Sequence, residues 1–330
     1  MDMKSIAAIH ESYGKASEVL KPVEVEVKNP GEGEVLIKLV RASVNPSDMG
    51  MIGGSYGRLR TLPAVAGREG IGEVVELGSG VEGLSLGDIV RIPEEPGVWA
   101  QYHIANADSL MKLPKGLEPD MLAMSFVNPP TALCILSEFG TLKEGDWIIQ
   151  NGAGSALGYF MIQLCASRGI KTVNILRNAA AKSESLKKIG ADLVIDEKEF
   201  NPKALKDLTS GALPKLGLNQ IGGESVSNMI KAMANSGTIV TVGAMTSEPI
   251  RFPTRFLIFN DLRLRGFWWD KWQKTHSKEE VAKLFDEIFK LIAGGVLRAP
   301  VDSVFSLSDI HSAMLRAECS SRNGKVMLKA

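Results

Sequence analysis

The sequence predicts an α/β protein in which a doubly wound parallel sheet is inserted into a discontinuous, β-rich domain. Residues 1 to about 125 alternate short β-like runs with Gly and Pro turns, whereas strand-like and helical segments alternate between about 126 and 265. Alternating strands and helices are typical of parallel sheets, and short turn-bounded runs of antiparallel sheets or barrels. Because the strand-like runs after 266 resemble those of the first block, we expect one domain of residues 1–125 and 266–330 and another of 126–265.

Each expected element rests on a local pattern of apolar residues bounded by Gly, Pro or Asp. In the first block the expected strands are 35–40, 72–78 and 88–93. In the second block we expect strands at 147–150, 172–176, 193–196, 216–221 and 237–243, and helices at 157–168, 181–189 and 225–234. After residue 266 we expect an amphipathic helix at 278–293, a strand near 301–305, a helix from 308 and a last strand at 325–329.

The composition excludes several classes of function. Among the 330 residues, 38 Lys and Arg balance 38 Asp and Glu, which argues against a nucleic-acid binder or a polybasic membrane surface. Cys134, Cys165 and Cys319 lie far apart and form no CxxC pair, which argues against a disulfide framework or a thiolate zinc site. The uncharged stretch 147–167 contains a polar glycine turn, unlike a membrane-spanning helix. Residues 1–19 lack the features of a signal or transit peptide, so we expect a cytoplasmic protein, with a processed mitochondrial-matrix form as the alternative.

A glycine-rich turn between the strand at 147–150 and the helix that follows carries most of the functional information. It reads Gly-Ala-Gly-Ser-Ala-Leu-Gly over residues 152–158, a GxGxxxG spacing one residue longer than GxGxxG. In dinucleotide-binding βαβ units such glycines let backbone N–H groups approach a pyrophosphate, and the helix N-terminus favours the anion. The turn therefore predicts a dinucleotide site; the alternative is a structural turn in some other α/β protein.

The end of the second strand in this block indicates which dinucleotide is used. An NAD site usually places an acidic residue there to bind the ribose 2′-hydroxyl. Here the strand is followed by Arg177 and Asn178, and arginine matches the geometry of a phosphate. We therefore expect NADPH as the cofactor, although an exposed loop arginine is the plain alternative.

The order of the blocks, the Gly-Arg-Glu-Gly string at 67–70 and the Gly-Ser-Gly turn at 78–80 resemble the medium-chain dehydrogenase/reductase superfamily over essentially the whole chain. This resemblance implies a Rossmann domain that binds NADPH, inserted into a GroES-like catalytic domain. Zinc-dependent members hold a catalytic metal with a Cys and a His, but the matching positions here are Asn45 and Arg68, and zinc takes neither as a ligand. The resemblance therefore implies a zinc-free branch, and we expect no metal.

Five strings narrow the resemblance to the 2-enoyl thioester reductases of the mitochondrial trans-2-enoyl-CoA reductase type: 45–48, 54–57, 128–132, 173–177 and 262–268. The implied reaction transfers a hydride from NADPH to the β-carbon of an enoyl-CoA or enoyl-ACP, in fatty-acid synthesis. Negative charge then develops on the thioester oxygen, and a tyrosine hydroxyl suits it because it can donate a hydrogen bond and pass on a proton. The family's tyrosine falls on Tyr56, whose alternative is a turn tyrosine packed on the surface.

The same matching implies a set of cofactor contacts. The residues expected to bind NADPH are Asn45, Asn128, Gly154, Ser155, Ala156, Leu157, Arg177, Asn178, Gly243, Ala244, Met245, Phe267, Trp268, Trp269 and Lys325. For the aromatic residues the alternative is a core or dimer-interface cluster; for Lys325 it is an exposed strand lysine, and for Asn45 a turn residue before proline. One departure is Ala156, which stands where the family usually has glycine.

Two further expectations concern partners and competing functions. The resemblance implies a homodimer formed through edge strands of the cofactor domain. Arg58 and Arg60 could offer a basic surface to an acyl carrier protein, or could simply be solvated. The competing functions are a zinc-free NADPH-dependent quinone or enone reductase and a non-enzymatic protein that retains the nucleotide fold.

Overall fold

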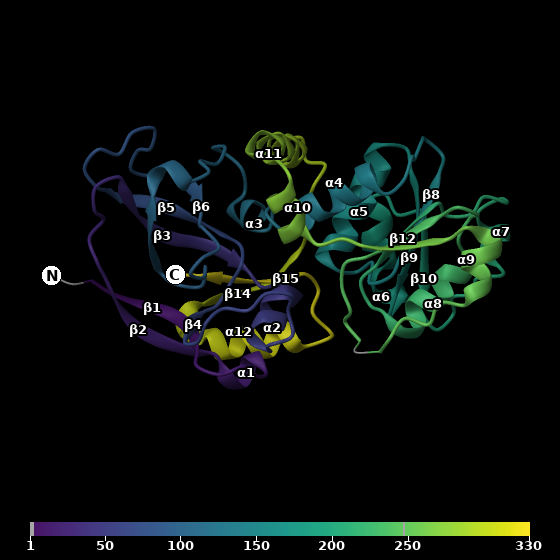
Figure 1. Cartoon of the computed structure of the whole chain (residues 1–330), viewed down its shortest axis with the longest axis horizontal. Coiled ribbons are helices and arrows are strands. Elements are labelled where there is room, and N and C mark those ends of the chain that lie inside the picture. The colour runs from purple at the N-terminus through teal and green to yellow at the C-terminus, as the bar shows by residue number, and fades with distance from the viewer. Residues whose placement is uncertain (1–2, 247) are drawn as a thin grey trace. The chain divides into compact units, whose positions relative to one another are not determined.

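The computed structural model describes residues 3–246 and 248–330, and the chain divides into two compact units (Figure 1). One unit comprises Met1–Phe126 and Ala299–Ala330, and the other comprises Val127–Arg298. The first unit is discontinuous in sequence, as expected, and the first boundary lies one residue from the expected position. The second boundary differs: the chain returns to the first unit at Ala299 and not at 266.

The first unit is built from two sheets. A three-stranded sheet has the order β2-β1-β4, and a six-stranded sheet has the order β14-β15-β3-β5-β6, with β7 also paired to β3. The strands are β1 Met3–His10, β2 Lys21–Val27, β3 Glu34–Ser43, β4 Ala64–Val65, β5 Gly70–Leu77, β6 Ile89–Arg91, β7 Tyr102–Asn106, β14 Val301–Ser306 and β15 Lys325–Lys329. The helices are α1 Ala16–Val19, α2 Pro46–Ile52, α3 Pro119–Ala123 and α12 Ile310–Glu318.

The C-terminal segment completes this first unit. Strand β15 pairs antiparallel with β3, with Met327 opposite Ser43 and Leu328 opposite Ala42. The same strand pairs parallel with β14, so both C-terminal strands extend the sheet begun by the N-terminal segment. Buried side chains from the two segments form one hydrophobic core that includes Ile37, Trp99 and Leu328.

The second unit is a doubly wound sheet of six parallel strands in the order β10-β9-β8-β11-β12-β13. Its strands are β8 Trp147–Gln150, β9 Lys171–Leu176, β10 Leu193–Asp196, β11 Leu216–Asn219, β12 Thr238–Thr241 and β13 Arg263–Gly266. Its helices are α4 Asn128–Glu138, α5 Ala156–Ser167, α6 Ala179–Lys188, α7 Leu205–Leu208, α8 Gly223–Lys231, α9 Thr254–Asn260, α10 Trp269–Thr275 and α11 Lys278–Ala293. The expected α/β class is confirmed, and the strand order reverses between β8 and β11, where such sheets bind ligands.

The packing of helices α10 and α11 explains why the second boundary comes late. One face of α11 is buried through Phe285, Ile288, Phe289 and Ile292, and the helix contacts α4 of the second unit. Its start is fixed by a capping box in which Ser277 and the helix residue Glu280 each bond the other's backbone. The amphipathic pattern predicted the helix bounds correctly, but such a pattern does not say which sheet the apolar face will cover.

Five elements of the second unit were not anticipated from the sequence: α4, α7, α9, β13 and α10. Strand β13 was not predicted because all four of its residues are exposed, so the strand shows no alternation of buried and exposed positions. Helix α4 begins with Asn128 and two prolines, which are tolerated in the first turn of a helix. Across residues 3–246 and 248–330, none of the helices combines the length and apolar character that spanning a bilayer demands.

Candidate active site

The glycine turn joins β8 to α5 in the predicted strand–turn–helix arrangement. Gly152 has φ +61°, a conformation that favours glycine, and Ser155 caps the helix by accepting a 3.0 Å hydrogen bond from the N–H of Gly158. A Cβ on Gly158 would stand 2.4 Å from the carbonyl oxygen of Ala153. Glycine is therefore required at this position for the helix to pack against its own turn.

Buried amide side chains connect the ends of β8 and β11, where the strand order reverses. Asn151 Nδ2 donates to Asn219 Oδ1 at 2.8 Å, and the Gln220 N–H donates to Asn151 Oδ1 at 2.7 Å. The Ser155 hydroxyl donates to Gln220 Oε1 at 2.8 Å, which ties the helix cap to the same network. Sequence reasoning missed Asn219 and Gln220, although two amides ending two buried strands are a readable signal for a polar site.

Cationic side chains lie at the end of β9, beside the glycine turn. Arg177 is exposed, and within the described part of the chain its side chain has no hydrogen-bond or ion-pair partner. Asn178 has the left-handed φ of +55° and precedes α6, whose first N–H, that of Ala179, donates to Asp196 Oδ2 at 3.0 Å. Lys182, one turn into α6, lies so close to the turn that a Cβ on Gly154 would stand 3.3 Å from its Nζ. The sequence analysis did not single out Lys182, although a lysine so soon after Arg177 is a signal for a phosphate.

The chemistry of this turn fits a dinucleotide. The backbone at Gly152 and Gly154 carries no side chain, the N-terminus of the 12-residue α5 opens there, and Lys182 adds a positive charge. After β12, Gly243 passes so close to the end of β11 that a Cβ on it would lie 2.9 Å from Gln220 O. The Met245 N–H donates to the same oxygen at 3.3 Å, its side chain is 59% exposed, and Ala244 is also exposed.

The structure separates the three aromatic residues that were expected at the cofactor. Trp268 is 37% exposed, and Phe267 packs edge-on against Phe139 with ring centroids 6.0 Å apart. Trp269 is only 5% exposed; it stacks on Trp272 at 5.2 Å and meets Phe285 edge-on at 6.2 Å. For Trp269 this packing favours the alternative of a core aromatic over contact with a cofactor.

In the first unit, Tyr56 lies in the loop after α2 and is half-buried. Its hydroxyl oxygen accepts a 2.7 Å hydrogen bond from Arg68 Nη1, and the guanidinium carbon lies 4.9 Å from the centre of its ring. Arg68 is only 2% exposed, and its Nε donates to Glu94 Oε1 at 2.7 Å. Tyr56 is therefore held by a buried cation and is not merely a surface turn residue.

A buried polar network surrounds Asn45, which the resemblance matched to a zinc-ligand position. Asn45 Nδ2 donates to Glu69 Oε1 at 2.7 Å and to Ser43 Oγ at 3.1 Å. Lys325 Nζ donates to Asn45 Oδ1 and, at 3.0 Å, to the carbonyl oxygen of Val44. The side chains of Asn45 and Lys325 are thus engaged with each other, and the alternative of an exposed strand lysine is wrong, because Lys325 is 7% exposed.

The charges in this network are perturbed by their surroundings. Burial lowers the pKa of the Lys325 ammonium, and the nearby carboxylates of Glu69 and Asp48 partly oppose that shift. Burial also raises the pKa of the Asp48 carboxyl, although the N–H of Asn45 donates to Asp48 Oδ2 at 2.7 Å. Among the described residues, no group of three or more His, Cys, Asp and Glu side chains could hold a metal ion.

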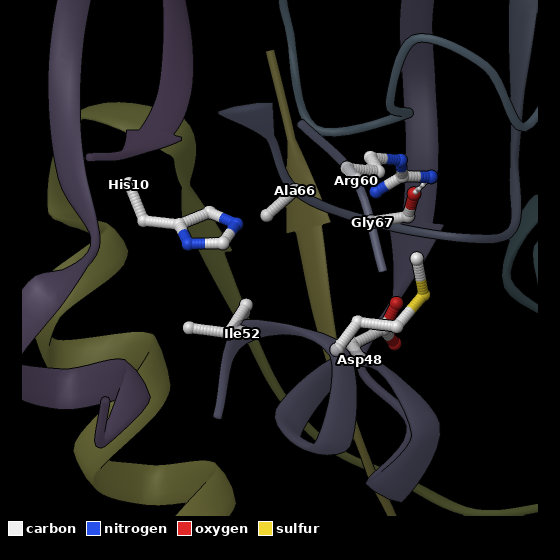
Figure 2. A pocket seen from close by; sticks show the side chains of 7 residues that line it. His10, Asp48, Ile52, Arg60, Ala66 and Gly67 are labelled. Atoms are coloured by element: carbon white, nitrogen blue, oxygen red, sulfur yellow. Dashed lines mark hydrogen bonds between the residues drawn. The ribbon is translucent and has the colours of Figure 1, made fainter. Parts of the chain in front are cut away.

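Figure 2 shows side chains that line a small hollow in the first unit, among them His10, Asp48, Arg60 and Gly67. In this structure it has no room for a water molecule. Beside this hollow, Arg60 Nη2 donates a 2.9 Å hydrogen bond to the carbonyl oxygen of Gly67, and Arg60 Nε pairs with Glu95 at 3.1 Å. Arg58 pairs with Glu94 and Glu95. The arginines suggested for a carrier protein therefore pair with two acids, and Glu94 also pairs with Arg68.

Comparison with known proteins assigns both units. The model of the alcohol dehydrogenase GroES-like domain matches residues 31–115, and the model named zinc-binding dehydrogenase matches residues 156–289. The mitochondrial enoyl-[acyl-carrier-protein] reductase of Xenopus tropicalis is 36% identical over 93% of this chain and 90% of its own length. That of Rattus norvegicus is 37% identical over 93% of this chain and 84% of its own length. The chain belongs to this family of enoyl reductases.

Solved structures agree with that assignment. The Etr1p complex with NADP and crotonyl-CoA superposes with a TM-score of 0.89 at 28% identity, covering 99% of this chain and 100% of that one. The mitochondrial 2-enoyl thioester reductase Etr1p/Etr2p heterodimer of Candida tropicalis gives a TM-score of 0.87 at 28% identity over the same shares. One matching model is named for zinc, and the correspondence of Asn45 and Arg68 to zinc-ligand positions stays a prediction from the resemblance.

Proposed function

We propose that this chain is an NADPH-dependent enoyl thioester reductase, which converts 2-enoyl-CoA or 2-enoyl-ACP to the saturated acyl thioester in fatty-acid synthesis. The observation that carries the proposal is the identity of 36–37% with enoyl reductases over 93% of the chain. The site residues support it, because the second unit offers a dinucleotide turn and the first unit offers a tyrosine held by a buried cation.

NADPH supplies the hydride, which goes to the β-carbon of the substrate. The π electrons of the substrate double bond then move toward the thioester, so that an enolate carries the negative charge. Tyr56 gives its hydroxyl proton to the α-carbon: its O–H bond breaks, a C–H bond forms, and the resulting phenolate regains a proton from solvent. A preorganised donor at developing charge is usually a large contribution to catalysis, and general-acid assistance adds about 10²–10⁴-fold.

The residues expected to bind NADPH fall into groups according to the part of the cofactor, or of the protein, to which we assign them. We assign the pyrophosphate to the turn of Gly154, Ser155, Ala156 and Leu157, and the 2′-phosphate to Arg177 with Asn178, assisted by Lys182. Asn128, Gly243, Ala244, Met245, Phe267 and Trp268 stay assigned to the nicotinamide and acyl side. Asn45 and Lys325 already bond each other, so we assign them to holding the loop before Tyr56.

An assay of NADPH oxidation with crotonyl-CoA, run beside the same assay with a quinone, tests the proposal. We expect rapid oxidation with the enoyl thioester and little with the quinone. Tyr56→Phe should lower turnover about 100-fold or more while the Kd for NADPH stays within about twofold, because the phenol proton is lost and the nucleotide turn is untouched. Quinone reduction without turnover of any enoyl thioester would support the competing quinone reductase.

An apolar face on the second unit supports the homodimer. Leu257, Ile258 and Phe259 of α9 are 47%, 66% and 78% exposed, and Leu264 on β13 is 37% exposed. Among the described strands β13 pairs only with β12, so its outer edge is available for a second copy of the chain. Sedimentation should give a dimer for the native protein and a monomer for Ile258→Glu; a native monomer would contradict the proposal.

Two further proposals concern the cellular compartment of the protein and the carrier of the acyl group. The relatives are named as mitochondrial enzymes, which supports the mitochondrial alternative over the cytoplasm. The acyl carrier, coenzyme A or acyl carrier protein, is left open by the pairing of Arg58 and Arg60 with Glu94 and Glu95, because both carriers are acidic. Comparing kcat/KM for matched CoA and carrier-protein thioesters would decide between them.

A further inference from the structure

We propose that Arg68 is a positioning residue for Tyr56: it fixes the phenol oxygen and stabilises the charge that forms when the tyrosine gives up its proton. This inference rests on the proposed function, in which Tyr56 is the proton donor. It assigns a task to a buried cation that the resemblance matched to a zinc-binding histidine.

The guanidinium of Arg68 is held rigidly before any substrate arrives. Its side chain is 2% exposed, and its Nε donates to Glu94 Oε1, whose own side chain is 17% exposed. The preceding residue, Gly67, has φ +94°, and a Cβ there would lie 2.2 Å from the ring of Trp99. The backbone just before Arg68 is therefore packed against Trp99, and the ion pair with Glu94 holds the guanidinium with Nη1 2.7 Å from Tyr56 Oη.

The direction of this hydrogen bond suits a proton donor. Arginine can only donate, so the contact occupies a lone pair of the tyrosine oxygen and does not consume its hydrogen. The ring also faces the cation, with the guanidinium carbon 4.9 Å from its centre. Both contacts hold the phenol in place while its proton stays a donor.

The contact becomes stronger as the reaction proceeds. When the O–H bond of Tyr56 breaks, the oxygen becomes negative. The hydrogen bond from Arg68, which already has a charged donor, then joins two opposite charges and gains their Coulomb attraction in a poorly solvated place. Only interactions that strengthen toward the transition state accelerate a step. Arg68 should therefore contribute to kcat and hardly to the KM for substrate, by about 10- to 100-fold.

A double-mutant cycle tests this. Arg68→Met, Tyr56→Phe and the double variant would be assayed for kcat and KM with crotonyl-CoA, together with the Kd for NADPH and the melting temperature. We expect Arg68→Met to lower kcat about 10- to 100-fold, with KM and NADPH affinity nearly unchanged. In the Tyr56→Phe background the same change should have almost no further effect, because its only route of action is gone.

Arg41→Met is the control for the loss of an arginine ion pair in the same unit: Arg41 pairs with Asp120 at 2.8 Å, although its side chain is more exposed than that of Arg68 (29% against 2%). Its kcat should equal that of the native protein. If Arg68→Met does not fold, the same cycle with Glu94→Gln applies: it loosens Arg68 and should give a smaller loss of kcat, which again vanishes in the Tyr56→Phe background.

Equal losses from Arg68→Met with and without Tyr56, or a loss confined to stability, would overturn the inference. The failure of the proposed function would look different. If the proposed function were wrong, the native protein would not reduce crotonyl-CoA at all, or Tyr56→Phe alone would leave kcat unchanged.

Discussion

Replacing Gly158 by alanine would test how closely α5 must pack on its own turn. The added Cβ would stand 2.4 Å from Ala153 O and 2.7 Å from its carbonyl carbon, whereas ordinary contact begins at 3.4 Å. These are backbone atoms, so no side-chain rotation relieves the overlap. Overpacking costs about 1–3 kcal/mol, and a backbone overlap belongs at the upper end. At about 3 kcal/mol the melting temperature should fall by roughly 6–12 °C, and NADPH should bind at least about 10-fold more weakly because the turn is displaced.

Gly154→Ala is the matched comparison, two residues before the helix. Its Cβ would meet the ends of two side chains, Lys182 at 3.2 Å and Leu176 at 3.3 Å, which can move aside. The melting temperature should therefore change by less than about 2 °C, while NADPH affinity still falls, because the methyl group occupies the path of the pyrophosphate. Thermal unfolding and fluorescence titration with NADPH measure both quantities. A native melting temperature and native affinity for Gly158→Ala would refute the reasoning.

Two further predictions concern charge. Arg177→Ala should weaken NADPH binding about 10- to 100-fold more than NADH binding; equal losses, measured by titration with each nucleotide, would contradict the 2′-phosphate assignment. In the first unit, Arg316 donates to both oxygens of Asp302, at 2.6 and 2.7 Å, and holds the pKa of that carboxyl well below its usual range. A lowered folded-state pKa gives stability that is present above the unfolded pKa, near 4, and is lost as the pH falls below it. Asp302→Asn should therefore lower the unfolding free energy by about 2 kcal/mol at pH 7. Denaturant unfolding should show the difference in unfolding free energy between native protein and variant shrinking below about pH 4. A difference that does not depend on pH would exclude the ion pair as its cause.

The local parts of the account could be predicted from the sequence. The turn at 152–158 and the helix at 278–293 follow from residues that contact their own neighbours, glycines in one case and the capping box of Ser277 in the other. The bounds of α11 and of β15 were correct because cap, periodicity and flanking turn agree within a few residues.

What escaped prediction depends on contacts between distant parts of the chain. Lys325 meets Asn45 across 280 residues only because β15 pairs with β3. Predicting the amide network requires the order of the strands in the sheet. That order places β11 beside β8, although β9 and β10 lie between them in the sequence. The chain returns to the first unit at Ala299 and not at 266, and the apolar stripe of α11 does not show by itself which unit the helix will pack against.

The central claim is best tested by following the hydride. NADPH carrying deuterium at C4 would be incubated with the protein and crotonyl-CoA, and the product would be analysed by mass spectrometry and NMR. We predict butyryl-CoA with one deuterium at the β-carbon and one solvent-derived hydrogen at the α-carbon, formed far faster by the native protein than by Tyr56→Phe. Failure to reduce any enoyl thioester, while a quinone is reduced rapidly with the same NADPH, would contradict the account.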